Sequence, residues 1–122
     1  MYTKTPPMGW NSWNTFGLAL TDAIIRETAD AMVSLGYRDA GYTYIIMDDG
    51  WMLPQRDAQG CFVPDPLKFP HGIRALADYV HSKQLKLGIY SCAGTRTCGQ
   101  FPGSFDHEFS DAKQFAEWHI DY

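Results

Sequence analysis

The chain has 122 residues, a size typical of one small domain, and its composition of 45% hydrophobic, 15% aromatic and 20% charged residues excludes a disordered or collagen-like protein. The net charge of -4, without any basic run, argues against nucleic acid and anionic membrane surfaces as partners. Residues 1–7 lack the apolar segment of a signal peptide and the longest apolar run is far too short to span a bilayer, so we expect neither a signal peptide nor a membrane anchor. The sequence assigns no compartment and no oligomeric state.

Segments with helical and strand periodicity alternate along the chain. Thr21 is a natural N-cap before the first helical pattern, and Gly36 is a natural stop after it. The strand patterns are apolar on both faces, as in parallel strands buried inside a sheet. The predicted strands are 8–10, 42–47, 85–90 and the beginning of one at 120–122, and the predicted helices are 22–35, 72–83 and 111–118.

The resulting order, β-α-β-α-β-α-β, predicts a parallel α/β fold with helices outside the sheet. The strand-to-helix connections 48–71 and 91–110 are long, which places functional residues at the carboxyl edge of the sheet, as in (β/α)8 barrels and doubly wound folds. No glycine-rich phosphate-binding pattern follows a strand, and this disfavours a nucleotide site. Because the sequence stops inside the last predicted strand, we expect it to be a fragment of a larger domain.

Two adjacent acidic residues, Asp48 and Asp49, follow the buried strand 42–47 directly. Adjacent carboxylates repel each other, and a ligand rich in hydrogen-bond donors or a cation usually compensates for that repulsion. Carboxylates accept hydrogen bonds from sugar hydroxyls, while aromatic rings such as that of Trp51 cover the apolar faces of a sugar. The pattern therefore favours a carbohydrate site, and a turn or helix-capping role for the two residues is the alternative.

The other residues that could carry chemistry give weaker signals. Trp10, Trp13 and Trp51 lie at or just after strand ends; isolated tryptophans are more often core residues, but polar neighbours favour a loop position for Trp13. Neither the three cysteines nor the four histidines have the spacing of a metal site, so we expect no metal and no cofactor. The absence of a G-x-S-x-G motif disfavours acyl transfer.

Six short segments carry a resemblance to a known family: 5–13 (TPPMGWNSW), 44–51 (YIIMDDGW), 69–73 (FPHGI), 85–90 (LKLGIY), 97–98 (TC) and 101–104 (FPGS). In this order they resemble the N-terminal part of the α-galactosidases, or melibiases, of glycoside hydrolase family 27. The resemblance implies an α/β fold of the TIM, or (β/α)8, barrel type, followed by a small β domain. Residues 1–122 are then about the first three and a half βα units, truncated before the fourth strand is complete. It also implies hydrolysis of terminal α-linked galactose with retention of configuration.

The resemblance further implies site residues for an α-galactoside substrate. The family residue matching Trp13 lines the sugar pocket, those matching Asp48 and Asp49 bind galactose hydroxyls, and the tyrosine matching Tyr90 lies beside the nucleophile. The cysteine matching Cys98 normally pairs with one just after the nucleophile, so we expect Cys98 to be a free thiol here. The family sequence continues after residue 122 with LKYD, whose aspartate is the nucleophile. We therefore expect both catalytic acids to lie beyond this chain and the isolated chain to be inactive.

Three positions depart from the family pattern. Gly50 stands where many members have a disulfide-bonded cysteine, Cys92 stands at a position that is often aspartate, and His119 at one that is often glycine. Two alternatives to an α-galactosidase remain open at this point. One is an α-N-acetylgalactosaminidase of the same family, and the other is a sugar-binding module without catalysis.

Overall fold

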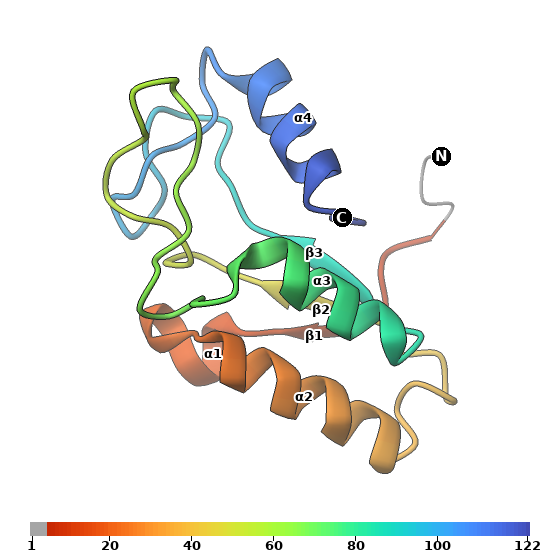
Figure 1. Ribbon diagram of the computed structural model, residues 1–122. Coiled ribbons are helices and arrows are strands. Elements are labelled where there is room, and N and C mark those ends of the chain that lie inside the picture. The colour runs from red at the N-terminus through yellow and green to blue at the C-terminus, as the bar shows by residue number, and fades with distance from the viewer. Residues whose placement is uncertain (1–4) are drawn as a thin grey trace.

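The computed structural model describes residues 5–122, whose three short strands form one parallel sheet (Figure 1). Residues 1–4, which belong to the segment where no signal peptide is expected, lie outside the described part. β2 is the middle strand, and the register aligns its Ile45 with Trp10 on one side and with Leu87 on the other. The strands are β1 (Gly9–Asn11), β2 (Tyr44–Met47) and β3 (Lys86–Ile89).

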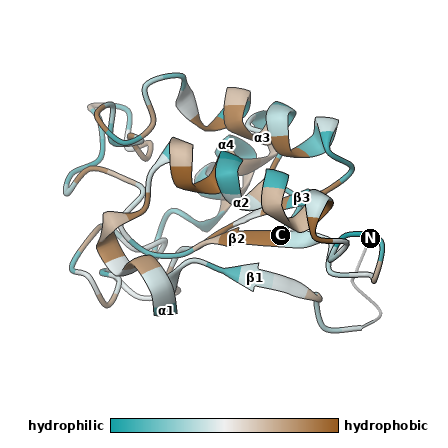
Figure 2. Ribbon diagram, turned by 90° about the horizontal axis from the view of Figure 1, so that it is seen from below, coloured by the Kyte–Doolittle hydropathy of each residue, from teal (hydrophilic) through white to brown (hydrophobic). Residues whose placement is uncertain are grey.

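Helices cover the sheet. α2 packs against β2 and α3, and α3 packs against β3, so these two helices lie side by side along the sheet (Figure 1). Figure 2 shows β2 as strongly hydrophobic, as expected of a strand at the centre of a core. The predicted parallel α/β arrangement is thereby confirmed. The helices are α1 (Trp13–Phe16), the short 3-10 helix η1 (Gly17–Ala19), α2 (Asp22–Ser34), α3 (Gly72–Ser82) and α4 (Glu108–Glu117).

α2 begins and ends as its sequence predicts. The side chain of Thr21 accepts a hydrogen bond from the backbone N–H of Ile24 at 3.3 Å, which satisfies one of the free donors of the first turn. The helix ends at Ser34, and Gly36 then has a φ of 79°, a left-handed conformation that glycine adopts without strain. The inner side of the helix is buried through Ile25, Ala29 and Met32.

Three helices differ from the prediction. α4 begins at Glu108 rather than at residue 111, because residues 108–110 are exposed and have no apolar period that could mark them in the sequence. η1 was not predicted, since it has only three residues. α1 was not predicted, since four residues are too few for a helical period to show. In the part of the chain from 5 to 122, no helix is long and apolar enough to cross a membrane.

The segment 120–122 lies alongside β3 but does not form a regular strand. Its backbone makes two hydrogen bonds with β3, from Asp121 N to Leu87 O and from Ile89 N to Tyr122 O, both of 2.9 Å. The prediction of a strand at 120–122 is therefore wrong, although the segment does pair with β3 through these two bonds. Ile120 is half-buried and packs against the core, because the turn after α4 directs the chain back to the sheet.

His119 adopts a backbone conformation that favours glycine. Its φ is 60°, and the turn that it forms is closed by hydrogen bonds from His119 N to Ala116 O and from Ile120 N to Phe115 O, both of 3.0 Å. We expect His119→Gly to raise the stability by up to about 1 kcal/mol, because it removes the strain of a left-handed non-glycine residue. Thermal unfolding of the two proteins measures this difference.

The matched control for that experiment is His71→Gly. His71 is also exposed, but its φ of -100° is an ordinary value, so this change should give no gain. A thermal midpoint that falls in His119→Gly would show that the exposed contact of His119 Nδ1 with Oδ1 of Asp78, at 3.5 Å, outweighs the backbone strain.

An aromatic cluster joins α4 to the connection between β2 and α3. Trp51 is fully buried, and its ring meets those of Phe62, Phe115 and Trp118 edge to face, with centroids 5.2, 6.2 and 5.8 Å away. Its Nε1–H donates to the backbone oxygen of Tyr90 at 2.8 Å, just after β3. Trp51 is therefore a core residue, and its position after Asp49 does not make it a wall of a sugar pocket.

Candidate functional site

The carboxyl ends of the three strands bring the predicted site residues to one edge of the sheet. Trp13 lies just after β1, Asp48 and Asp49 follow β2, and Tyr90 follows β3. Cys98 lies in the connection between β3 and α4, within 3.9 Å of the Tyr90 hydroxyl. The Trp13 side chain is 41% exposed at the start of α1, so it is available to a ligand.

Asp48 is half-buried and is oriented by the end of β1. Its Oδ2 accepts a hydrogen bond from Nδ2 of Asn11 at 2.8 Å, and its backbone N–H donates to Oγ of the buried Ser12 at 3.0 Å. The other end of the Asn11 amide accepts the backbone N–H of Trp13 at 2.8 Å. Asn11 thus links Asp48 to the segment that carries Trp13, a role that the sequence analysis missed.

Asp49 is only 1% exposed, and backbone donors hold both of its carboxylate oxygens. Oδ1 accepts from Gly50 N at 2.9 Å, and Oδ2 accepts from Gly99 N at 2.6 Å. A further hydrogen bond, from Asp49 N to Oδ1 of Asp48, joins the two acids at 2.8 Å. These hydrogen bonds hold the two carboxylates in fixed orientations at the end of β2.

Tyr90 presents a hydroxyl that stays protonated at neutral pH. Burial raises the pKa of Tyr90 to about 12, and the hydrogen bond to Cys98, together with the nearby Cys98, Asp49 and Cys92, adds to the shift. A protonated phenol can both donate and accept a hydrogen bond. The site therefore combines carboxylate acceptors, a phenol donor and an exposed indole ring, a set suited to a polyhydroxy ligand.

A second element at this edge is the hairpin formed by residues 95–103. Arg96 and Pro102 form an antiparallel bridge within it, and its tip carries Cys98 and Gly99, the residues that contact Tyr90 and Asp49. Gly99 is a site residue that the sequence does not predict. Its contact with Asp49 spans 50 positions of the chain, and no local pattern could have revealed it.

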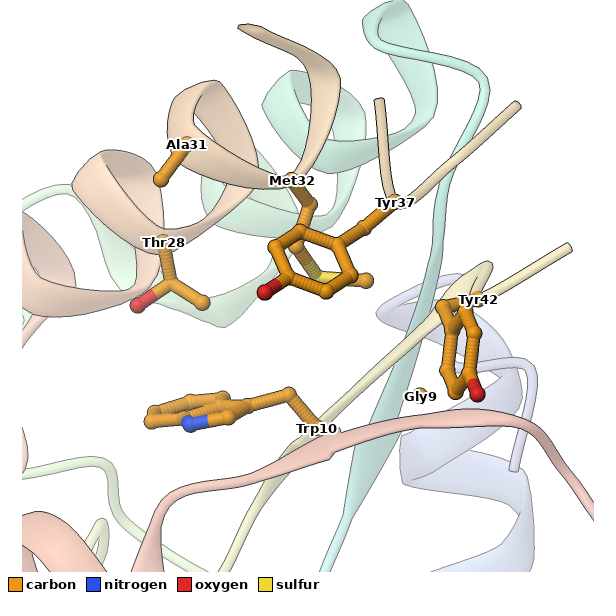
Figure 3. A pocket seen from close by; sticks show the side chains of 7 residues that line it. All are labelled: Gly9, Trp10, Thr28, Ala31, Met32, Tyr37 and Tyr42. Carbon is orange, nitrogen blue, oxygen red and sulfur yellow. The ribbon is translucent and has the colours of Figure 1, made fainter. Parts of the chain in front are cut away.

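A hollow lined largely by apolar and aromatic side chains lies elsewhere on the described surface. Figure 3 shows it between β1 and α2, where the rings of Trp10, Tyr37 and Tyr42 surround a volume of about 420 Å³. None of the five predicted site residues lines it. In residues 5–122 no group of three or more His, Cys, Asp and Glu side chains is placed to hold a metal ion.

The cysteines give a test of the expected free thiol. Cys61, Cys92 and Cys98 are all unpaired in the described residues, and Cys98 is exposed. We expect thiol titration of the denatured, non-reduced 122-residue chain to find reactive thiols, with Cys98 among those labelled in the folded chain, because its sulfur has access to solvent. A monomer in which all three sulfurs are unreactive would contradict this.

Comparisons with known proteins agree on one family. A family profile described as "Alpha galactosidase A" matches residues 5–122. The chain is 62% identical over 119 residues to an α-galactosidase of Coffea arabica and 58% identical over 120 residues to one of Cyamopsis tetragonoloba. These matches cover 97% and 98% of this chain but only 32% and 29% of the relatives, so the chain spans about a third of their length.

Solved structures give the same result. Alpha-galactosidase I from Mortierella vinacea has a TM-score of 0.95 at 47% identity, with 97% of this chain and 30% of that chain covered. An α-galactosidase from Saccharomyces cerevisiae, solved with raffinose, has a TM-score of 0.94 at 44% identity, with 97% and 26% covered. At 24% identity and a TM-score of 0.78, a Bacillus halodurans protein described as an α-N-acetylgalactosaminidase shares the fold alone.

The fold and these relatives place the chain in a family of glycoside hydrolases. Within that class, the chain belongs to the α-galactosidase (melibiase) family, glycoside hydrolase family 27.

Proposed function

We propose that the complete protein is a retaining α-galactosidase and that residues 1–122 form the N-terminal part of its (β/α)8 barrel. The observation that carries this proposal is the placement of Trp13, Asp48, Asp49 and Tyr90 at the carboxyl edge of a parallel sheet in a chain of this family. Each of the three strands is followed by a helix, so the chain supplies three of the eight units of such a barrel.

In this proposal the chain provides part of the pocket for the terminal galactose. Asp48 and Asp49 accept hydrogen bonds from sugar hydroxyls, since each carboxylate oxygen that already binds an N–H keeps a second lone pair. The exposed ring of Trp13 covers an apolar C–H face of the sugar, and the Tyr90 hydroxyl adds a donor. Cys98 lies beside that hydroxyl and bounds the pocket at the tip of the hairpin.

We assign neither catalytic carboxyl group to residues 1–122. Retention requires two carboxyl groups about 5 to 5.5 Å apart on either side of the scissile bond. Asp48 and Asp49 are neighbours in the sequence, joined by a hydrogen bond at the end of one strand, so they lie on the same side of a bound sugar and not on either side of its scissile bond. The nucleophile and the acid/base are then contributed by the rest of the complete protein.

The relatives support the proposed substrate class. The Saccharomyces cerevisiae α-galactosidase was solved with raffinose, an α-galactoside, and we extend this substrate class to the present protein. The α-N-acetylgalactosaminidase alternative is not favoured, because the relative with that description shares only the fold.

The test compares the complete protein with the 122-residue chain on chromogenic α-galactoside, α-glucoside and α-N-acetylgalactosaminide. We expect the complete protein to prefer the α-galactoside and to release α-galactose first, as NMR of the fresh product can show. The 122-residue chain should give no turnover above a buffer blank. Equal rates on the three substrates would refute the substrate assignment, and turnover by the repurified short chain would refute the placement of the catalytic acids.

A further inference from the structure

Arg56 joins three segments that lie far apart in the sequence. In the connection between β2 and α3, its Nη1 donates to Gly60 O at 2.8 Å and to Oδ1 of Asp111 at 2.7 Å. Its Nη2 donates to Oδ2 of Asp111 at 2.7 Å and to Gly103 O at 2.8 Å. The guanidinium also lies over the Phe62 ring, 3.9 Å from its centroid. Both Nη atoms of the planar guanidinium donate two hydrogen bonds each, and a lysine cannot reproduce this arrangement.

The ion pair at the centre of this contact set is buried. The Arg56 and Asp111 side chains are 12% and 3% exposed, so their attraction is little screened by solvent. Asp111 belongs to the first turn of α4, and Gly103 is the last residue of the 95–103 hairpin. Arg56 therefore fixes the base of the hairpin relative to α4 and to its own loop.

The hairpin is stiff between its base and its tip. Gly103 N donates to Thr95 O and Thr97 N donates to Phe101 O, both at 2.9 Å, and Thr97 is 2% exposed. At the base there is no room for movement toward Gly94, because a Cβ added at Gly103 would lie 2.0 Å from Gly94 O. A displacement of the base should thus be transmitted to the tip rather than absorbed in the hairpin.

The tip ends on the buried acid of the site. Gly99 N donates to Oδ2 of Asp49 at 2.6 Å, which is the contact between the hairpin and the carboxylate. The neighbouring Cys98 lies beside the Tyr90 hydroxyl. Base and tip are thus held by different partners, Arg56 at one end and Asp49 at the other.

We propose that Arg56 is a positioning residue for Asp49, acting through the 95–103 hairpin, and that it thereby sets the affinity of the site for the galactose unit. Arg56 itself makes no contact with Asp49 in this scheme. The part of the proposal that concerns galactose rests on the proposed function, whereas the mechanical coupling from Arg56 to Gly99 does not.

The test uses a double variant of the complete protein, Arg56→Met with Asp111→Leu. Removing both charges avoids leaving an unpaired buried ion, and replacement of a buried pair by apolar residues of similar size is often tolerated. The variant loses the bond to Gly103 O while it keeps apolar volume at both positions. Its matched control is Arg26→Met with Asp22→Leu. This second pair also joins an arginine to an aspartate, at 2.7 Å, and its arginine also lies over an aromatic ring, that of Tyr79, but it is on α2.

Two measurements separate the coupling from the function. Amide hydrogen exchange reports on Gly99, whose N–H is protected by Asp49, and the inhibition constant for galactose reports on the site. In the Arg56 double variant we expect the exchange rate of the Gly99 amide and the inhibition constant for galactose each to rise by about tenfold. A change of this size is typical when one charge-assisted hydrogen bond is lost. Exchange at Leu87 in β3 should stay unchanged, and the control variant should stay within about twofold of wild type in both measurements.

The outcomes are distinct. Unchanged exchange at Gly99 in a folded double variant overturns the proposal, and so does faster exchange with an unchanged galactose constant. A wild-type protein that does not bind galactose refutes the proposed function, while Gly99 exchange still decides whether Arg56 controls the hairpin. Should the double variant fail to fold, Arg56→Lys replaces it, since a lysine can keep the ion pair with Asp111 but cannot also reach Gly103 O in the same geometry. Arg56→Lys should then show the same two changes in smaller size, and wild-type values in both would overturn the proposal.

Discussion

Asp48→Asn in the complete protein is expected to lower kcat/KM for an α-galactoside at least about tenfold, because each charge-assisted hydrogen bond to a sugar hydroxyl contributes about 1.5 to 3 kcal/mol. The fold should survive this change. Asp48 is half-buried, and an asparagine oxygen can still accept the N–H of Asp49 that Oδ1 now accepts at 2.8 Å. The bond from Nδ2 of Asn11 to Oδ2 is lost, but the Asn11 side chain is exposed, so water can replace that acceptor. We therefore expect near-normal thermal stability together with weak activity. The reverse result, a less stable protein with normal kinetics, would assign Asp48 a turn or capping role.

Asp49→Asn, unlike Asp48→Asn, should lower the stability of the protein as well as its activity, because Asp49 is buried. Both of its oxygens accept backbone N–H groups, so an amide NH2 at either position must face the donor of Gly50 or of Gly99. We expect this variant to lose about 1 to 3 kcal/mol of stability as well as activity. A site that recognises galactose should also lose part of its preference over the matching α-glucoside in both variants. Full activity with unchanged preference in both would end the assignment of the two acids to the sugar.

Arg56→Met alone should lower the free energy of unfolding by about 3 to 5 kcal/mol, because it leaves the carboxylate of Asp111 buried without its partner. Asp111 is 3% exposed and accepts two hydrogen bonds of 2.7 Å from Arg56 in the native protein. The double variant that also replaces Asp111 should recover most of this loss, since no charge then remains buried. Urea unfolding of the wild type, the single variants and the double variant measures the coupling between the two residues.

An exposed ion pair gives the matched control for that measurement. Arg74 and Asp78 lie 3.4 Å apart on α3 with side chains 51% and 56% exposed, so Arg74→Met should cost less than about 1 kcal/mol. Equal losses in the free energy of unfolding in Arg56→Met and Arg74→Met would show that burial does not strengthen the ion pair of Arg56 with Asp111.

The regular elements could be predicted because their signals are local. The N-cap at Thr21, the apolar side of α2 and the stop at Gly36 lie within one stretch of chain, and the predicted helix 22–35 matches the observed Asp22–Ser34 closely. The predicted strand 42–47 was too long at its start, because Tyr42 is apolar in character but 42% exposed before the sheet begins. Periodicity thus identifies an element well and its first residues poorly.

Residue patterns alone indicated only Asp48 and Asp49 as a ligand site, whereas Trp13, Tyr90 and Cys98 were predicted through the family resemblance. Asp48 and Asp49 could be found because acidic residues after a buried strand stand out in the sequence. Asn11 and Gly99 could not, since their contacts with the two acids span 37 and 50 positions. Arg56 and its partner Asp111 are 55 positions apart, and either residue alone reads as an ordinary surface charge.

The aromatic cluster around Trp51 provides a spectroscopic signal for the packing of the two long strand-to-helix connections. Trp51 and Phe62 belong to one loop, Phe115 and Trp118 belong to α4 and its end, and the indole N–H reaches the start of the other loop at Tyr90. Aromatic rings held in a fixed asymmetric arrangement give a near-ultraviolet circular dichroism signal, which disappears when side-chain packing becomes fluid even if the helices remain. The near-ultraviolet band of this protein therefore reports on the attachment of both loops to the sheet, separately from the far-ultraviolet band of the helices.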